Sequence, residues 1–122
     1  MPKKTKTTKF AEKTKRIYLA PFDYTVNIVV SNDVKKSAKS RTSKNEDVPD
    51  FAAIHIYSDE RPSSCIILPE HPDVSYVSHE TFHCVWRIMK YIGAEFNNEI
   101  MAYLNGYLVQ QICRFVTGRD RL

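Results

Sequence analysis

The chain of 122 residues has little glycine, no long apolar run and no paired cysteine motif. Its three glycines and six prolines argue against a low-complexity or fibrous sequence. Three cysteines, an odd number with no C-x-x-C pair, argue against a disulfide framework and favour a reducing compartment. No apolar stretch approaches the roughly 20 residues of a membrane span, and no hydrophobic signal segment follows the basic N-terminus. We therefore expect a cytoplasmic protein without a membrane partner.

Positive charge is concentrated in the first half of the chain. Residues 1–50 contain 12 Lys and Arg against 6 Asp and Glu, whereas residues 51–122 contain 6 against 8. Residues 1–16 hold seven basic side chains and a single acid, Glu12. We interpret residues 1–16 as a basic arm and residues 17–122 as a single domain. The charge of the arm suits contact with nucleic acid or another polyanion, and it equally suits a solvated tail.

The chain alternates between strand and helix patterns. Residues 24–30 alternate β-branched side chains and predict a strand, and residues 51–57 predict a second strand. A turn at residues 59–62 predicts a hairpin to a third strand at residues 64–68. Between the first two strands, Ser31 to Asp33 suit a helix N-cap or a turn, with a short helix ending near Ser40.

Two long helices are expected to follow. The first runs from an N-cap at Asp73 to about Ile92 and ends at Gly93, and the second runs from residue 97 or 98 to Val116. Each helix has an apolar stripe, formed by Val74, Val77, Phe82, Val85, Met89 and Ile92 in the first and by Ile100, Leu104, Leu108, Ile112 and Phe115 in the second. Together these patterns predict an α+β fold, in which a small antiparallel sheet of about three strands packs on two C-terminal helices.

Residues 79–83 read His-Glu-Thr-Phe-His, an H-E-x-x-H motif in the middle of the first long helix. The spacing of four places the imidazoles of His79 and His83 one turn apart on one face, where both can reach one cation. Imidazole is a good zinc ligand, and a tetrahedral ion accepts two ligands from one helix. Glu80 lies about 100° around the helix from His79, suited to take a proton from a metal-bound water. The alternative is a pair of surface histidines beside an unrelated glutamate.

A zinc site needs a third protein ligand, for which the candidates are His71, Cys84, Glu95 and Glu99. His71 lies in a loop flanked by prolines, and Cys84 suits a buried position. Glu95 falls in the turn between the two helices. Glu99 lies in the first turn of the second helix, where the backbone is fixed and the helix dipole favours a carboxylate.

Other polar side chains have less specific signals. Tyr76, Tyr103 and Tyr107 are candidates for a hydroxyl that stabilises an oxyanion, although a helical tyrosine commonly packs with its hydroxyl at the surface. Asn98 either orients a zinc-bound histidine or caps the second helix. His55, on a strand, is interpreted as structural.

Asn98-Glu99, with Ala102 three residues later, resembles the gluzincin pattern, in which H-E-x-x-H is followed after a turn by a helix with N-E-x-x-A. Residues 77–112, about the last third of the chain, are similar to small zincin-like proteins encoded by bacteriophages and prophages. The resemblance implies a minimal zincin-like domain with Zn²⁺ on His79, His83 and Glu99. Asn98 and Tyr103 are the candidates for supporting or oxyanion-binding groups. The spacing from His83 to Glu99 is a few residues shorter than in familiar gluzincin peptidases.

The resemblance also implies a zinc-dependent hydrolase of the metallopeptidase type, with Glu80 as general base and a peptide or protein as substrate. In zincins the peptide adds to the edge strand beside the active-site helix, and residues 64–68 are expected to form that edge. The alternative is a non-catalytic phage structural or host-interaction protein that retains the zinc-binding scaffold, which the small size and the basic arm favour. For a phage-encoded protein, the cytoplasm would be that of a bacterial host.

Overall fold

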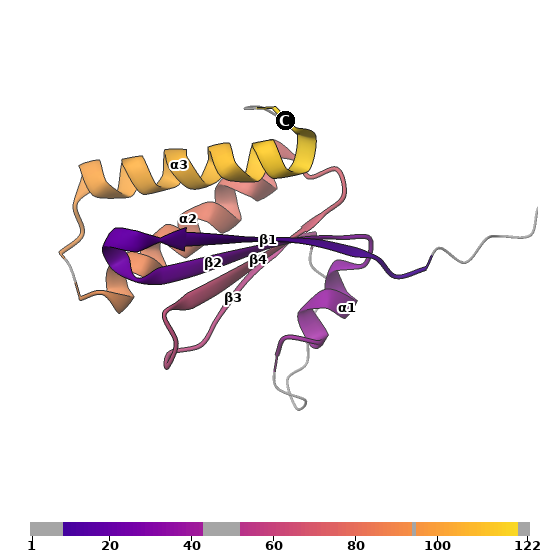
Figure 1. The fold of residues 1–122 in the computed structure, drawn as a ribbon, viewed down its shortest axis with the longest axis horizontal. Helices are drawn as coiled ribbons and strands as arrows, with labels where there is room; N and C mark the ends of the chain where they lie inside the picture. The colour runs from indigo at the N-terminus through magenta and orange to yellow at the C-terminus, as the bar shows by residue number, and fades with distance from the viewer. Residues whose placement is uncertain (1–8, 43–51, 94, 120–122) are drawn as a thin grey trace, which may run out of the picture.

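A four-stranded sheet in the order β1-β2-β4-β3 forms the middle layer of the protein. The computed structural model describes residues 9–42, 52–93 and 95–119. The elements are β1 (Glu12–Leu19), the 3₁₀ turn η1 (Ala20–Phe22), β2 (Tyr24–Ser31), α1 (Val34–Lys39), β3 (Ile54–Tyr57), β4 (Ser63–Pro69), α2 (Val74–Tyr91) and α3 (Asn98–Thr117). Helices α2 and α3 lie on one side of the sheet and α1 lies on the other (Figure 1). The α+β class is therefore confirmed.

The sheet is mixed rather than antiparallel. β1 pairs with β2 and β3 pairs with β4 in antiparallel fashion, whereas β2 and β4 run parallel. After β2 the chain passes through α1 and forms β3 at the outer edge of the sheet. The β3–β4 hairpin then places β4 between β3 and β2. The expectation of about three antiparallel strands is thus wrong in both number and direction. The strand predicted at residues 51–57 begins at Ile54, and Phe51 lies outside the described residues.

Strand β1 corrects the interpretation of residues 1–16 as an arm. Residues 12–16 belong to β1, in which Glu12 pairs with Ser31 and Arg16 with Asn27. Ile17 and Leu19 of the same strand are buried in the core. Lys13 and Lys15 share a face with Ile17 and Leu19, and they interrupt the apolar alternation there because the first half of this edge strand is only partly covered. Residues 1–8 lie outside the described part of the chain.

The ends of the helices follow the predicted caps with two differences. Asp33 caps α1 by accepting a hydrogen bond from the Lys36 backbone at 3.1 Å. Asp73 occupies the N-cap of α2 but makes no side-chain cap bond. Asn97, and not Asn98, caps α3, and its side-chain oxygen accepts from two backbone N–H groups of the first turn. None of the described helices is long and apolar enough to cross a membrane.

The apolar faces of α2 and α3 fill the space above the sheet. The first stripe is only partly as predicted, because Val74 and Phe82 are 64% and 55% exposed. Thr81 and Ile88 are fully buried instead. The face of α2 that packs on the sheet is therefore rotated from the predicted stripe and includes polar residues. The side chains that form this core are Tyr24, Val26, Ile28, Ile66, Leu68, Val77, Cys84, Val85, Ile88, Met89, Leu104, Leu108 and Ile112.

Candidate active site

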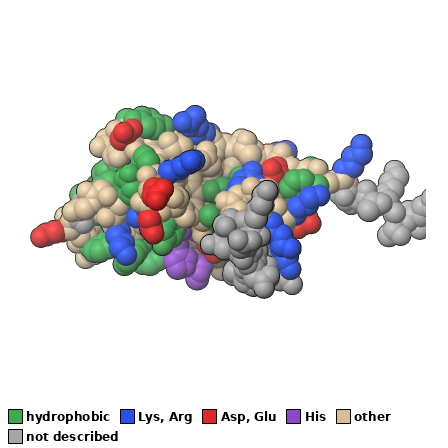
Figure 2. Space-filling view, turned by 90° about the horizontal axis from the view of Figure 1, so that it is seen from below, with side chains coloured by type: hydrophobic (Ala, Val, Ile, Leu, Met, Phe, Trp, Pro, Cys, Tyr) green, Lys and Arg blue, Asp and Glu red, His purple; other side chains and the backbone are tan. Residues whose placement is uncertain are grey.

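His79, Glu80 and His83 lie together where α2 faces strand β3. They line a cavity of about 400 Å³ whose other wall is formed by Ala53, Ile54, His55 and Tyr57. Figure 2 shows histidine side chains gathered in one place on the face seen from below. The structure therefore brings the three residues of the H-E-x-x-H motif to one surface, and it adds a histidine from the neighbouring strand.

The two motif histidines form a close pair. Their Nε2 atoms are 3.0 Å apart, and their rings meet edge to face with centroids 4.6 Å apart. Two nitrogens bound to one tetrahedral zinc ion at about 2.0–2.1 Å lie about 3.3 Å from each other. The His79 side chain is 66% exposed, so solvent reaches the pair. The observed distance is that of a hydrogen bond between the two rings, and it is within about 0.3 Å of the separation expected for two ligands to one zinc ion.

Glu80 is turned toward the sheet and is only 9% exposed. Its Oε1 atom lies 4.0 Å from Nε2 of His79. Burial raises the pKa of the Glu80 carboxyl, while the two histidines and a hydrogen bond from the His55 backbone act in the opposite direction. A carboxylate whose pKa is raised toward neutrality is a better general base than an exposed one.

A chain of hydrogen bonds connects the cavity to the core. Nε2 of His55 lies 2.8 Å from the Ser64 hydroxyl, which lies 2.6 Å from the hydroxyl of the fully buried Tyr24. Burial, with smaller contributions from His83 and Arg87, lowers the pKa of His55 to about 4. His55 is therefore neutral at neutral pH. Sequence reasoning missed this network, since the three residues are 9 to 40 positions apart.

Arg87 fastens strand β3 to helix α2. Its side chain is 8% exposed and donates from Nη2 to the Ser58 carbonyl at 3.0 Å. The guanidinium lies over the rings of Tyr57 and Tyr91, with 4.6 and 5.1 Å to their centroids. The signal in the sequence was a charged residue beside the apolar stripe of a helix, which by itself does not identify a partner.

The structure does not bring Glu99 to the histidine pair. The described residues contain no group of three His, Cys, Asp or Glu side chains that could hold a metal ion. Ile100, next to Glu99, lines a cavity with the end of β1, whereas the histidines face β3, and these strands are the opposite edges of the sheet. Three strand spacings, about 14 Å, separate the two edges.

The remaining candidate ligands are also distant or buried. His71 lines a cavity with Ala11, Glu12 and Phe115, at the other end of the sheet. Cys84 is fully buried, which raises the pKa of its thiol to about 12 and keeps it protonated. Glu95 is exposed in the turn before α3.

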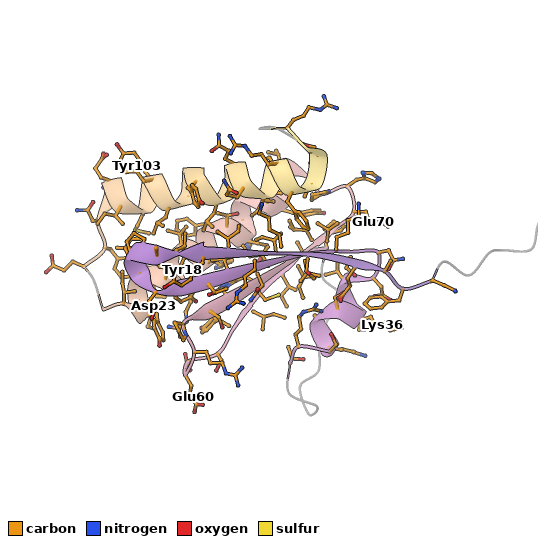
Figure 3. The ribbon with its side chains drawn as sticks, viewed as in Figure 1. Tyr18, Asp23, Lys36, Glu60, Glu70 and Tyr103 are labelled. Carbon is orange, nitrogen blue, oxygen red and sulfur yellow. The ribbon has the colours of Figure 1, made fainter. Side chains whose placement is uncertain are left out.

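The candidate supporting and oxyanion-binding residues lie away from the site. Tyr103 is 76% exposed in the N-terminal part of α3 (Figure 3) and lines a cavity with the end of β1. Tyr107 lines the same cavity near the β1 end as Tyr103 does. Asn98 is exposed and does not cap its helix. Tyr76 is 39% exposed on α2 and does not line the histidine cavity.

The edge strand beside the motif is β3. The expectation that residues 64–68 form this edge is wrong, because β4 lies between β2 and β3. The hairpin places β3 outside β4, next to His79, Glu80 and His83. The side of β3 away from β4 pairs with no other described strand.

The lowered pKa of His55 predicts a pH-dependent stability. The unfolded chain binds a proton on His55 below about pH 6.5, whereas the folded chain does so only near pH 4. The free energy of unfolding should therefore fall by about 2–3 kcal/mol as the pH drops from 6.5 to 4, with no further loss from His55 below that range. Denaturant unfolding at several pH values, in chelator, should show that His55→Gln removes this part of the slope. His71→Gln, at an exposed position, should leave it, and equal slopes for wild type and His55→Gln would contradict the prediction.

Comparisons of the chain with protein-family models, with curated proteins and with solved structures give no match.

Proposed function

We propose that this protein is a zinc-dependent hydrolase of the metallopeptidase type. The observation that carries the proposal is the pair of imidazole nitrogens 3.0 Å apart, with a nearly buried carboxylate 4.0 Å from one of them, beside an unpaired strand edge. In hydrolysis the histidine pair would bind the metal ion, the carboxylate would accept a proton and the strand edge would bind the substrate. A helix surface with a structural role alone does not require these three features together. Two adjacent histidines that are not ligands would also repel each other once protonated.

The donor set suits zinc in type and spacing. His79 and His83 would hold the ion through their Nε2 atoms. The His79 side chain is largely exposed, so an ion can reach it from solvent. Bound there, zinc would supply a Lewis acid that polarises a carbonyl oxygen and lowers the pKa of water. With two protein ligands from the described residues, we expect weaker binding than at a site with three.

Glu80 is the proposed general base. Its carboxylate is held in place by the buried face of α2 and lies on the sheet side of the histidines, toward β3. From there it would take a proton from the attacking water and return the proton to the leaving amine. Its raised pKa brings the group closer to the pH at which both transfers are efficient.

Strand β3 is the proposed binding surface for the substrate. An extended peptide that adds to the free edge of β3 would gain backbone hydrogen bonds and would pass the cavity lined by His79, Glu80 and His83. Arg87 would hold the end of this strand at a fixed distance from α2 through its bond to the Ser58 carbonyl. The scissile carbonyl would then lie within reach of the motif without a second lobe.

Zinc binding is the first test of the proposal. Elemental analysis of protein purified without chelator and equilibrated with zinc should find one zinc ion per chain. His79→Ala and His83→Ala should each reduce the zinc affinity by orders of magnitude, whereas Glu99→Ala should change it by less than about threefold, because Glu99 lies near the other sheet edge. No stoichiometric metal in the wild type would refute the site. A large loss in Glu99→Ala would instead favour the complete gluzincin ligand set.

The absence of a third ligand among the described residues favours a second candidate function. In this alternative the protein is a non-catalytic structural or host-interaction protein that retains the histidine pair as a scaffold. Such a protein would bind zinc without cleaving any peptide, and Glu80 would have no chemical role. Peptide cleavage by the wild type therefore separates the two functions.

A further inference from the structure

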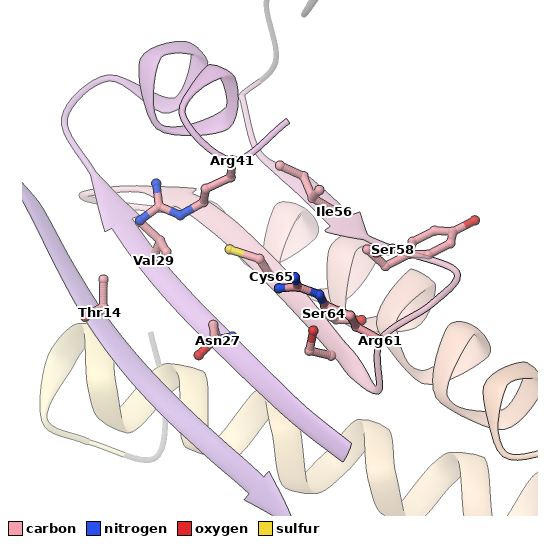
Figure 4. A pocket seen from close by; sticks show the side chains of 11 residues that line it. Thr14, Asn27, Val29, Arg41, Ile56, Ser58, Arg61, Ser64 and Cys65 are labelled. Carbon is pink, nitrogen blue, oxygen red and sulfur yellow. The ribbon is translucent and has the colours of Figure 1, made fainter. Parts of the chain in front are cut away.

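A cavity lies on the face of the sheet that α2 and α3 do not cover. It has a volume of about 450 Å³ and extends from α1 to the β3–β4 turn (Figure 4). Its floor is formed by Thr14 of β1, Asn27 of β2 and Cys65 of β4. Asn27 and Cys65 are register partners on adjacent strands. Their neighbours Ile28 and Ile66 are buried against the helices, so the floor residues point to the opposite side.

Two arginines reach over this floor from opposite ends. Arg41 enters from the chain after α1, and Arg61 enters from the turn between β3 and β4 (Figure 4). The charge of Arg41 is already compensated, because its two terminal nitrogens donate to the Glu12 carboxylate at 2.7 and 3.1 Å. Arg61 makes no ion pair within the described part of the chain. One guanidinium at the cavity therefore has no counter-charge from the described residues.

The other lining groups favour an anion as well. Among the described residues that line the cavity there is no carboxylate, and Thr14, Asn27 and Ser63 offer hydroxyl and amide donors. Burial raises the pKa of the Cys65 thiol to about 11, so this side chain adds no negative charge at neutral pH. Asn27 is half-buried and makes no side-chain hydrogen bond with a described residue.

The lining is also apolar on one side. Val29 and Ile56 contribute aliphatic surface to the lining, whereas the Tyr57 ring lies on the other face of β3, against His55 and Arg87. A cavity of this size with a few convergent polar groups is typical of small-molecule sites. A ligand that matches both halves has a charged head with several acceptor oxygens and an apolar or aromatic body.

We propose that this cavity binds a small organic oxyanion whose charged group lies on Arg61 and Asn27 and whose apolar part lies on Ile56 and Val29. A guanidinium presents its donors in a planar fork that suits carboxylate and phosphate oxygens alike. The site is separate from the histidine cavity, since the two lie on opposite faces of the sheet and Tyr57, at the end of β3, is the lining residue that they share. The inference does not depend on the proposed hydrolase activity.

The test is an NMR titration of the full chain with phenyl phosphate, benzoate and inorganic phosphate. Phenyl phosphate or benzoate should cause saturable shifts at Asn27 and Cys65 with a dissociation constant of about 1 mM or tighter. The tighter of the two identifies the head group, and inorganic phosphate, which lacks the apolar body, should bind at least about tenfold more weakly.

Matched variants separate a built site from general attraction to a basic surface. Arg61→Gln, at an exposed turn position, should weaken binding about tenfold or more. Arg119→Gln removes the same charge from an exposed position that does not line the cavity, and it should change binding by less than about threefold. Equal losses in the two variants, or no saturable shift with either aromatic probe up to about 10 mM, would overturn the proposal.

Discussion

Glu80→Gln should lower peptide hydrolysis by about 10²–10⁴-fold while zinc affinity and fold are retained. The substitution keeps the shape and polarity of the side chain but removes the group that accepts the proton. Because burial raises the pKa of Glu80, the ionised carboxylate costs stability in the folded state at neutral pH. The variant should therefore melt at the same temperature as the wild type or above it. Mass spectrometry of a cleaved peptide library and calorimetry measure the two effects.

Glu70→Gln is the matched control for this experiment. Glu70 is exposed in the loop that follows β4, at the end of the sheet remote from the β3–β4 turn (Figure 3), and its substitution should leave cleavage unchanged. Equal cleavage by wild type and Glu80→Gln would exclude Glu80 as the base. If neither protein cleaves any peptide and both bind zinc, the non-catalytic scaffold becomes the better account.

A chain that begins at residue 17 should be destabilised by about 3–6 kcal/mol, a large part of the stability of a small domain. The deletion removes the β1 residues that pair with β2 from Ser31 to Asn27. It also removes the ion pair of Glu12 with Arg41. The backbone groups of β2 would lose their partners on this side. The melting temperature should fall by at least about 10 °C.

The control for this deletion is a chain that begins at residue 9. It retains every described contact of β1, including the bond of the Ala11 N–H to Asn32 at 2.9 Å and that of Asn32 to the Lys9 carbonyl at 2.7 Å. Thermal unfolding of the two truncated chains, compared with the full chain, gives the result directly. If the chain from residue 17 melts with the full chain, residues 9–16 belong to the basic arm after all.

Local patterns predicted most of the fold because they act over a few residues. The strand from Tyr24, the hairpin to β4 and both long helices follow from alternation, turn residues and apolar spacing. The H-E-x-x-H motif is local in the same sense, and one helical turn brings His79 and His83 together whatever the rest of the chain does.

What the sequence did not predict depends on pairing between distant segments. Strand direction and order are set by the crossover through α1, so β4 became a central strand and β3 the edge. Apolar spacing defines a helix face only to within a turn, and the true face of α2 is turned far enough to bury Glu80 and expose Phe82. The position of Glu99 depends on where the second helix packs, which the N-E-x-x-A pattern does not determine.

The central position of β4 also constrains the order in which the fold can be assembled during synthesis. The β1–β2 hairpin involves neighbouring residues and can close in microseconds. The parallel partner of β2 begins only at Ser63, so the second edge of β2 stays open until some thirty further residues have left the ribosome. The apolar face that includes Val26 and Ile28 is covered later still, because both helices that bury it are C-terminal. An incomplete chain thus exposes a strand edge and an apolar surface together, the combination that chaperones recognise and that promotes aggregation.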